Sequence, residues 1–213
     1  MSDLPCPISH SSVYLALRRA ARVKRRRPKQ SLGLTKELLV KMLSSCPDTL
    51  SGQRDAALLG VGYDTLCRSC ELSWMRVEDI SLEDARIYIP RAKSDPFGDG
   101  RFARLTERTQ DHLSMWVERS QIKRGPLFRG LHNGQLSDAH MATSSIRRIV
   151  KCAARRAGLE TEAQHLSGHS MRVGAAQDMM KAGCHTIEIM TAGGWKNYEV
   201  VARYVEHSDI KRV

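Results

Sequence analysis

A histidine and an arginine stand three residues apart in the segment SGHSMRVGAAQDMMKAG, which covers residues 167–183. The segment has the pattern of an amphipathic helix, and residues three positions apart lie on the same face of a helix. His169 and Arg172 therefore share the first turn, directly after Gly168. Because the N-terminus of a helix favours anions, the pair is suited to hold a negatively charged group.

Five further side chains that can take part in chemistry are spread along the chain. Arg68 begins a helical segment in an apolar neighbourhood, and Glu71 follows one turn later. Lys93 lies at the end of the first strand of a predicted hairpin, Trp195 follows a Gly–Gly pair, and Tyr204 comes nine residues after Trp195. Each has a structural explanation of its own, such as a surface ion pair, a solvated charge or a core aromatic ring. Taken singly, they predict no function.

The elements that must position these residues are mostly helical. Hydrophobic periodicity and helix stop signals predict helices over residues 13–27, 36–43, 52–66, 67–75, 106–120, 142–157, 167–183, 187–193 and from about 197 onward. Thr35, Ser51 and Thr186 are the predicted helix openers, and Gly193 with Gly194 ends a helix. Residues 85–105 alternate, break at a Pro and Gly cluster and alternate again, which predicts a β-hairpin with a long loop. The predicted fold class is mainly α with a small antiparallel β-sheet (α+β).

The composition favours a polyanionic partner. The chain has 213 residues, with 34 Lys and Arg against 23 Asp and Glu, a net charge of +11. Such an excess is typical of proteins that bind nucleic acid or an anionic membrane surface. The sequence contains no run of about 20 apolar residues that would span a bilayer, and its beginning does not resemble a signal peptide. We therefore expect a cytoplasmic protein that does not enter a membrane, with its six cysteines reduced.

A metal site is not expected. Cys67 and Cys70 form one C-x-x-C, but a zinc site needs two further ligands and no second C-x-x-C occurs. His165, Cys184 and His185 follow no common zinc spacing relative to His169.

Taken together and in this order, the residues resemble the tyrosine recombinase (phage integrase) family. The family pattern is Arg, Glu or Asp, Lys, His-x-x-Arg, His or Trp, then Tyr. Here it is filled by Arg68, Glu71, Lys93, His169, Arg172, Trp195 and Tyr204. The resemblance runs from about residue 13 to 208 and is strongest in SGHSMRVGAAQDM, EIMTAGGW and LLGVGYDTLCRSCELSWMRVEDI. It implies the fold of a tyrosine recombinase catalytic domain, and it leaves Arg91 as an alternative to Lys93.

The resemblance implies a site-specific DNA recombinase that breaks and rejoins DNA strands through a 3′-phosphotyrosyl intermediate. Tyr204 is the implied nucleophile, because Tyr198 lies too close to Trp195 for the family spacing. A phenol has a pKa near 10, so Tyr204 needs a base, and His169 is the implied one. Lys93 is the implied acid for the leaving 5′-oxygen. The bond energy stays in the phosphotyrosine, so neither ATP nor a metal nor any other cofactor is expected.

The remaining four residues are implied to act on the phosphate. Arg68 and Arg172 suit a phosphate because a guanidinium is always charged and can bind two oxygens at once. Trp195 can donate its indole N–H to the same oxygens and pack against the helix of Tyr204. Glu71 is acidic, so it is expected to orient Arg68 or His169 and not to touch the phosphate.

Double-stranded DNA is the expected partner, and the basic run near the N-terminus is the main expected contact. Lys24, Arg25, Arg26, Arg27 and Lys29 are predicted to follow DNA phosphates. Residues 1–34 are interpreted as an N-terminal arm and basic linker, the remnant of a core-binding domain, and residues 35–213 as the catalytic domain. Weaker candidates for contacts with the DNA backbone are Arg101, Arg104, Arg147, Arg148, Arg155 and Arg156.

The chain also departs from the family. Only the last helix of the usual preceding domain is recognisable, and nine residues follow Tyr204, where the family has a further helix that docks into a neighbouring subunit. The resemblance implies a homo-oligomer, a tetramer on DNA, but these departures argue for weaker DNA binding and against a tetramer formed by this chain alone. They fit a piece of a longer protein or a naturally short recombinase. Two alternatives stay open: a non-catalytic DNA-binding protein on a recombinase scaffold and a type IB topoisomerase-like DNA relaxer.

Overall fold

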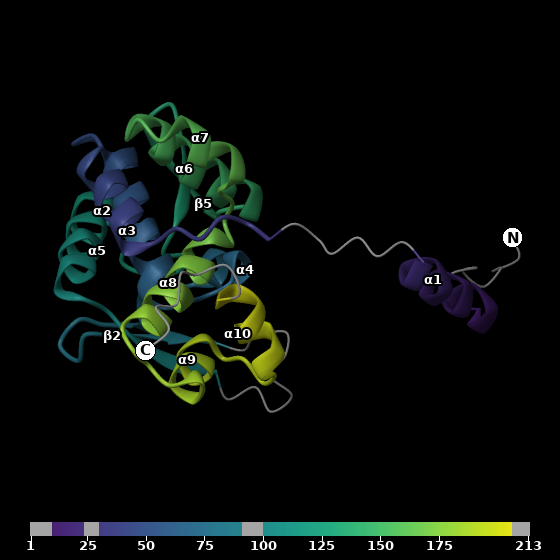
Figure 1. Cartoon of the computed structure of the whole chain (residues 1–213). Helices are drawn as coiled ribbons and strands as arrows, with labels where there is room; N and C mark the ends of the chain where they lie inside the picture. The colour runs from purple at the N-terminus through teal and green to yellow at the C-terminus, as the bar shows by residue number, and fades with distance from the viewer. Residues whose placement is uncertain (1–9, 24–29, 91–99, 206–213) are drawn as a thin grey trace, which may run out of the picture. The chain divides into compact units, whose positions relative to one another are not determined.

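The structure, a computed structural model, describes residues 10–23, 30–90 and 100–205 (Figure 1). Contacts within the chain separate two compact units, residues 1–30 and 31–213. In the first unit, α1 (Ser11–Val23) is an exposed amphipathic helix in which the Arg18 guanidinium lies 5.5 Å from the ring centroid of Tyr14. The predicted linker residues Lys24–Arg27 and Lys29 lie outside the described residues. None of the described helices is long and apolar enough to cross a membrane.

The second unit is mainly helical, as predicted. Its helices are α2 (Lys36–Ser44), α3 (Leu50–Asp64), α4 (Ser69–Trp74), the 3-10 turn η2 (Val77–Asp79), α5 (Glu107–Ser120), α6 (Thr143–Arg156), α7 (Glu160–His165), α8 (Ser170–Lys181), α9 (Thr186–Gly193) and α10 (Tyr198–Val205). Its strands are β1 (Ile80–Ser81), β2 (Arg86–Ile89), β3 (Arg101–Arg104), β4 (Arg129–His132) and β5 (Gln135–His140). The short helix α7 was not predicted.

The predicted hairpin forms β2 and β3 of a three-stranded antiparallel sheet in the order β1-β2-β3. Tyr88 pairs with Phe102 across it, and Ile89 pairs with Arg101. This register places Arg101 at the first position of β3.

A second antiparallel sheet, β4-β5, was not predicted. Asn133 and Gly134 connect its strands, and both have positive φ angles, 49° and 78°. An Asn–Gly pair is a strong signal for a two-residue hairpin turn, so the sequence did contain the information. The flanking strands are short and none of their residues is fully buried, so no alternating apolar pattern accompanies the turn.

The start of α3 differs from the prediction. The helix begins at Leu50, and the hydroxyl of Thr49 accepts a hydrogen bond from the backbone N–H of Gly52 at 3.1 Å. Thr49 is therefore the N-cap, and the prediction that Ser51 opens the helix is wrong by two residues. Both hydroxyl residues suit a cap, and the local pattern does not choose between them.

The other helix ends are mixed. Thr35 precedes α2 as predicted, although its side chain makes no capping hydrogen bond among the described residues. Thr186 is the first residue of α9, not its cap; the residue before it is His185, whose backbone N–H donates to the Glu188 carboxylate at 2.6 Å. Gly194 ends α9 in the left-handed conformation, with φ 64°, as predicted.

Two hydrophobic cores hold the second unit together. The larger one surrounds Trp116, which is fully buried and donates its indole N–H to the carbonyl of Leu127 at 2.9 Å. The smaller one lies among α8, α9 and α10, which pack against one another (Figure 1). Its buried members are Leu66, Ala175, Ala176, Ile189, Trp195 and Val201. Trp195 and α10 are thus positioned by a core of their own.

Candidate active site

Six of the seven predicted site residues are among the described residues, and Lys93 lies outside them. They come from the starts of α4 and α8, from the residue after the α9 cap and from α10 (Figure 1). These residues are Arg68, Glu71, His169, Arg172, Trp195 and Tyr204.

Gly168 brings the starts of α4 and α8 together. A Cβ atom at this position would lie 2.4 Å from the hydroxyl of Ser69, the first residue of α4. A Cβ atom here would require the Ser69 hydroxyl to rotate away, so the starts of the two helices are in close contact at Gly168. The close approach puts Arg68, the residue before Ser69, within electrostatic range of His169 and Arg172.

The side chains of His169 and Tyr204 meet directly. His169 Nε2 lies 2.8 Å from the Tyr204 hydroxyl, and their ring centroids are 5.4 Å apart. In the tautomer with its proton on Nδ1, the imidazole accepts the phenolic hydrogen. The side-chain amide of Gln177 donates to the Tyr204 carbonyl at 3.0 Å and ties α10 to α8. Gln177 was missed in the sequence, where its only signal is a polar side chain two helical turns after His169 on the same helix.

Arg172 is a buried cation with unused hydrogen-bond donors. Its side chain is among the largest that are fully buried, with 1% exposure. Nη1 donates to the carbonyl of Leu66, and the guanidinium carbon lies 4.0 Å from the ring centroid of Trp195. Among the described residues, none accepts a hydrogen bond from Nε or Nη2. Leaving a buried charged donor unsatisfied costs more than about 1–3 kcal/mol, so acceptor oxygens from a ligand would stabilise this arrangement.

Glu71 holds Arg68. Its carboxylate lies 2.6 Å from Arg68 Nη1 and accepts the Arg68 backbone N–H at 2.9 Å. The Glu71 side chain is only 4% exposed, whereas that of Arg68 is 31% exposed. Of the two partners expected for Glu71 from the sequence, the geometry therefore favours Arg68 over His169.

The site carries an excess of positive charge. Burial and then the charges of Arg172 and Arg68 lower the pKa of His169 to about 4. Burial and then Arg68 lower the pKa of Arg172 to about 10. At pH 7 the imidazole is therefore neutral and the guanidinium stays charged. A bound anion would oppose these shifts, because it stabilises each protonated form.

The lowered pKa of His169 predicts a pH dependence of stability. Between about pH 4 and the ordinary value of 6.5, the unfolded chain binds a proton at this residue that the folded chain does not. The free energy of unfolding therefore rises with pH across that window. We expect this residue to lower it by on the order of 2–3 kcal/mol as the pH falls from about 7 to about 4. Urea unfolding of the wild type and of His169→Gln at several pH values checks this, because glutamine stays neutral. Parallel curves for the two proteins would contradict it.

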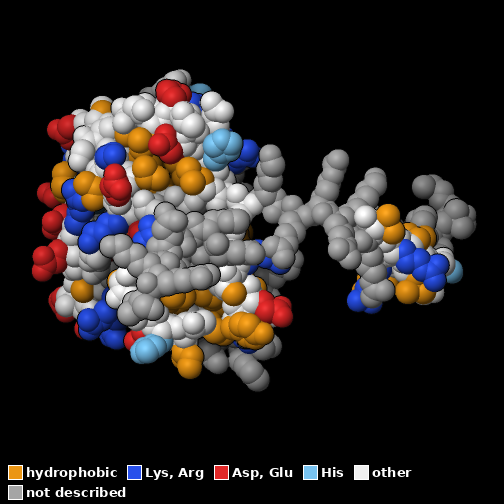
Figure 2. Space-filling model, viewed as in Figure 1, with side chains coloured by type: hydrophobic (Ala, Val, Ile, Leu, Met, Phe, Trp, Pro, Cys, Tyr) orange, Lys and Arg blue, Asp and Glu red, His pale blue; other side chains and the backbone are white. Residues whose placement is uncertain are grey.

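The charged surface does not by itself mark a binding face. On the face of the second unit seen in Figure 2, Lys and Arg side chains are interspersed with Asp and Glu. Two of the weaker candidates for DNA contacts bond to other residues of the protein, although Arg156 is itself exposed. Arg156 lies 3.3 Å from the carboxylate of Asp55, and Arg101 donates to two backbone carbonyls at 2.8 Å each. Arg104, Arg147 and Arg148 are exposed.

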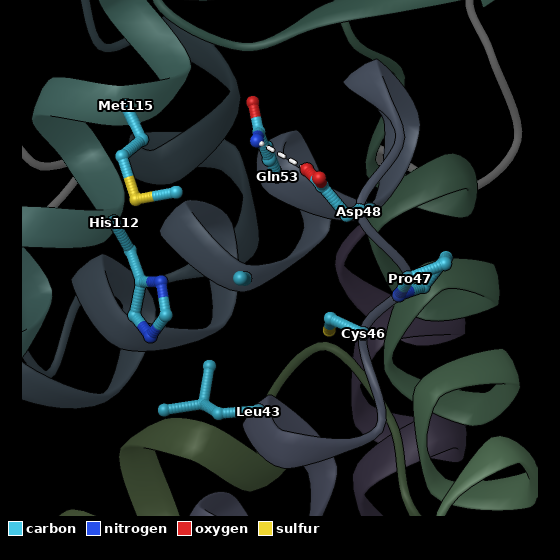
Figure 3. Close-up of a pocket in the computed structure, with 9 residues that line it drawn as sticks. Leu43, Cys46, Pro47, Asp48, Gln53, His112 and Met115 are labelled. Carbon is cyan, nitrogen blue, oxygen red and sulfur yellow. Dashed lines mark hydrogen bonds between the residues drawn. The ribbon is translucent and has the colours of Figure 1, made fainter.

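A pocket lies away from these residues, between the α2–α3 connection and α5 (Figure 3). In it, the Gln53 amide donates to the Asp48 carboxylate at 3.0 Å, and His112 and Met115 face them from α5. None of the predicted site residues is among the residues that line it. Within the described ranges, no group of three His, Cys, Asp or Glu side chains is placed to hold a metal ion.

Comparison with known proteins gives the same family as the motif. A model of the phage integrase family matches residues 33–211. Recombinase cre of Escherichia phage P1 is 32% identical over 228 aligned positions, which cover 98% of this chain and 66% of that protein. An integrase/recombinase xerD homolog of Selenomonas ruminantium is 32% identical over 178 positions, which cover 76% of this chain and 50% of that protein. The chain thus spans one half to about two thirds of the length of these relatives.

Solved structures show the same fold at lower identity. The XerA recombinase superposes with a TM-score of 0.70 at 19% identity, over 94% of this chain and 73% of that one. A lambda integrase (75-356) dimer bound to a COC′ core site superposes with a TM-score of 0.68 at 15% identity, over 95% of this chain and 74% of that one. These likenesses confirm the predicted mainly helical fold.

Proposed function

This chain belongs to the phage integrase family, the tyrosine recombinases, and from that premise we propose that it is a site-specific recombinase that breaks and rejoins DNA strands. The reaction passes through a 3′-phosphotyrosyl intermediate. The substrate is double-stranded DNA, and residues 35–213 form the catalytic domain.

One observation carries the proposal. The Tyr204 hydroxyl lies 2.8 Å from His169 Nε2, and beside them Arg172 holds two buried nitrogens for which the described residues offer no acceptor. A nucleophile, a neutral base and unsatisfied cationic donors are the three parts that attack on a phosphodiester requires.

The cleavage step uses these parts in order. The Tyr204 oxygen attacks phosphorus, and its proton passes to His169, directly or through a bound water. The new bond joins the tyrosine oxygen to the 3′-phosphate, and the bond between phosphorus and the 5′-oxygen breaks. Arg68 and Arg172 bind the non-bridging oxygens, whose charge grows as phosphorus becomes five-coordinate. The phosphate would also raise the pKa of His169 from about 4, and so strengthen the base when the substrate is bound.

The leaving 5′-oxygen needs a proton, and Lys93 is the proposed donor. It belongs to residues 91–99, which the structure does not describe, so the proposal for Lys93 rests on the family pattern. Rejoining reverses the chemistry: a 5′-hydroxyl attacks the phosphotyrosyl bond, and Tyr204 leaves with its proton restored. The number of phosphoester bonds is the same before and after, so the reaction needs no ATP.

DNA contacts outside the site are also part of the proposal. Lys24, Arg25, Arg26, Arg27 and Lys29 are proposed to bind DNA phosphates. Solved structures with the same fold include XerH bound to a difH substrate and lambda integrase as a dimer on a core site. The lambda integrase dimer supports a homo-oligomer on DNA for this chain as well, and multi-angle light scattering on and off DNA measures its size.

The experiment that tests the proposal is capture of the covalent intermediate. The probe is a library of nicked duplexes with randomised inverted repeats, in which the nick lets the released 5′-strand diffuse away. We expect an SDS-resistant protein–DNA adduct, and tryptic mapping should place the nucleotide on the peptide that contains Tyr204. Binding of duplexes without any adduct would favour the non-catalytic reading. Relaxation of supercoiled plasmids without selection of any repeat would favour the topoisomerase-like one.

A further inference from the structure

Arg101 is a cation that points into the protein. It opens β3, and its side chain is 17% exposed. Nη1 donates to the carbonyl of Ala192 and Nη2 donates to the carbonyl of Thr65, both at 2.8 Å. Two well-formed hydrogen bonds to backbone carbonyls fix a guanidinium in one orientation, because its planar fork directs both donors at once.

The two carbonyls belong to segments that carry site residues. Thr65 is the C-cap of α3, three residues before Arg68. Ala192 lies in the last turn of α9, three residues before Trp195. Arg101 therefore connects two segments that carry site residues. One carries Arg68, and the other carries Trp195, whose ring lies against Arg172.

Glu71 lies between two guanidinium groups. One carboxylate oxygen is 2.6 Å from Arg68 Nη1, and the other is 3.9 Å from Arg101 Nη2. That second oxygen also accepts the backbone N–H of Arg68 at 2.9 Å. The Glu71 carboxylate, which orients Arg68, therefore also lies beside the guanidinium of Arg101.

The turn into Trp195 packs on the same side chain. Gly194 has φ 64°, and a Cβ atom there would lie 3.3 Å from both Cδ and Nε of Arg101. At Gly193, a Cβ atom would lie 2.1 Å from the Trp195 ring. The two glycines let the chain pass closely between Arg101 and Trp195.

We propose that Arg101 is a positioning residue that sets the separation between the Arg68–Glu71 pair and Trp195, and with it the shape of the phosphate site. This inference rests on the proposed recombinase chemistry. It replaces the expectation that Arg101 contacts the DNA backbone, since its donors are directed at protein carbonyls. A displacement of about 1 Å in an active site can reduce the rate about 100-fold.

The test compares three variants. Arg101→Gln removes the charge and the fork, and Arg101→Lys keeps the charge but replaces the fork by a single ammonium group. Arg86→Gln is the matched control, because Arg86 lies on the adjacent strand and is exposed, and the described contacts of its side chain are with Asp84 and the ring of Phe102. Each protein is assayed for thermal unfolding, duplex binding and single-turnover cleavage of a duplex on which the wild type forms the adduct.

A spectroscopic measurement separates positioning from folding. The chain has three tryptophans, so 5-fluorotryptophan labelling gives three ¹⁹F resonances, with that of Trp195 assigned through Trp195→Phe. The resonance of Trp116, which lies in the larger core, is the internal reference. We expect the Trp195 resonance to shift in both Arg101 variants without DNA, while the Trp116 resonance stays in place.

For Arg101→Gln we expect cleavage to fall about 10- to 100-fold. The dissociation constant for the duplex should change less than about threefold, which is no more than the loss of one surface phosphate contact would cause. Arg101→Lys should recover part of the rate, and Arg86→Gln should match the wild type. Cleavage by Arg101→Gln at the wild-type rate would overturn the inference. The inference would also be overturned if duplex binding fell as much as cleavage while the Trp195 resonance did not move. That result would indicate that Arg101 contacts DNA.

The outcome is separable from that of the proposed function. If the wild type forms no adduct, the recombinase proposal fails, whereas the ¹⁹F shift still decides whether Arg101 positions Trp195. If Arg101→Gln does not fold, Arg101→Lys carries the test, because an ammonium group keeps the charge beside Glu71.

Discussion

Replacing Tyr204 by phenylalanine is expected to abolish the covalent adduct while the protein stays folded and binds DNA. The change removes one oxygen atom and keeps the ring, whose centroid lies 5.5 Å from that of Trp195 and 5.4 Å from that of His169. Losing the hydrogen bond to His169 should lower the free energy of unfolding by only about 1 kcal/mol. Losing the nucleophile should reduce cleavage by on the order of 10⁴–10⁶, as for nucleophiles of other covalent enzymes. Denaturing gels with end-labelled nicked duplexes measure the loss.

Tyr198→Phe is the matched control. Tyr198 begins the same helix, α10, six residues before Tyr204, and its side chain is 65% exposed. We expect this variant to form the adduct at the wild-type rate. An adduct that persists in Tyr204→Phe and disappears in Tyr198→Phe would show that the nucleophile is the other tyrosine.

Part of the site could be read from local sequence. His169 and Arg172 are three residues apart in a helical pattern, so their common face follows from helix geometry alone. The same holds for Arg68 and Glu71, which form their ion pair within one turn. Tyr204 is different, because 35 residues separate it from His169. Nothing local brings them together, and only the resemblance to a family singled out this tyrosine among five.

Other features depend on tertiary contacts that no local pattern encodes. The net charge of +11 predicted an anionic partner, but it did not tell which arginines face inward. Arg101 and Arg104 occupy the same short strand, yet the first bonds to backbone carbonyls of α9 and of the residue after α3, and the second is exposed. The carbonyls that accept from Arg101 become neighbours only when α3, β3 and α9 have packed. Alternation along the strand put the two on different sides, but the sequence did not say which side was the interior.

The fold shows why the site depends on several segments at once. Arg172 is buried and bonds through Nη1 to Leu66, while its guanidinium stacks on Trp195. Its remaining donors have no described acceptor, so the folded protein maintains a cation that water reaches poorly. Such preorganised donors stabilise a transition state more than the ground state, because they need no rearrangement when charge develops. The smaller hydrophobic core, which lies among α8, α9 and α10, holds Arg172 in place.

Replacing Arg172 by alanine is therefore expected to reduce cleavage by about 10²–10³, close to 3 kcal/mol of transition-state stabilisation. Duplex binding should weaken only slightly, because one phosphate contact among many changes the affinity and its salt dependence little. Single-turnover cleavage and fluorescence anisotropy on the same duplex measure the two quantities. Arg119→Ala controls for the lost charge, since Arg119 is exposed and pairs with Asp48.

Because Arg172 is fully buried, its removal also leaves a cavity beside Trp195, and a loss of activity has to be separated from a loss of folding. Arg172→Lys retains the charge but not the fork, so it should fold and still cleave slowly, since an ammonium group cannot reach Leu66 and the phosphate together. Guanidinium ion at low concentration should restore part of the cleavage by Arg172→Ala and none by Arg172→Lys, because only the first has an empty space of the right shape. If cleavage and binding fell by the same factor in Arg172→Ala, Arg172 would contribute ground-state binding alone, and the buried donors would not be aimed at the transition state.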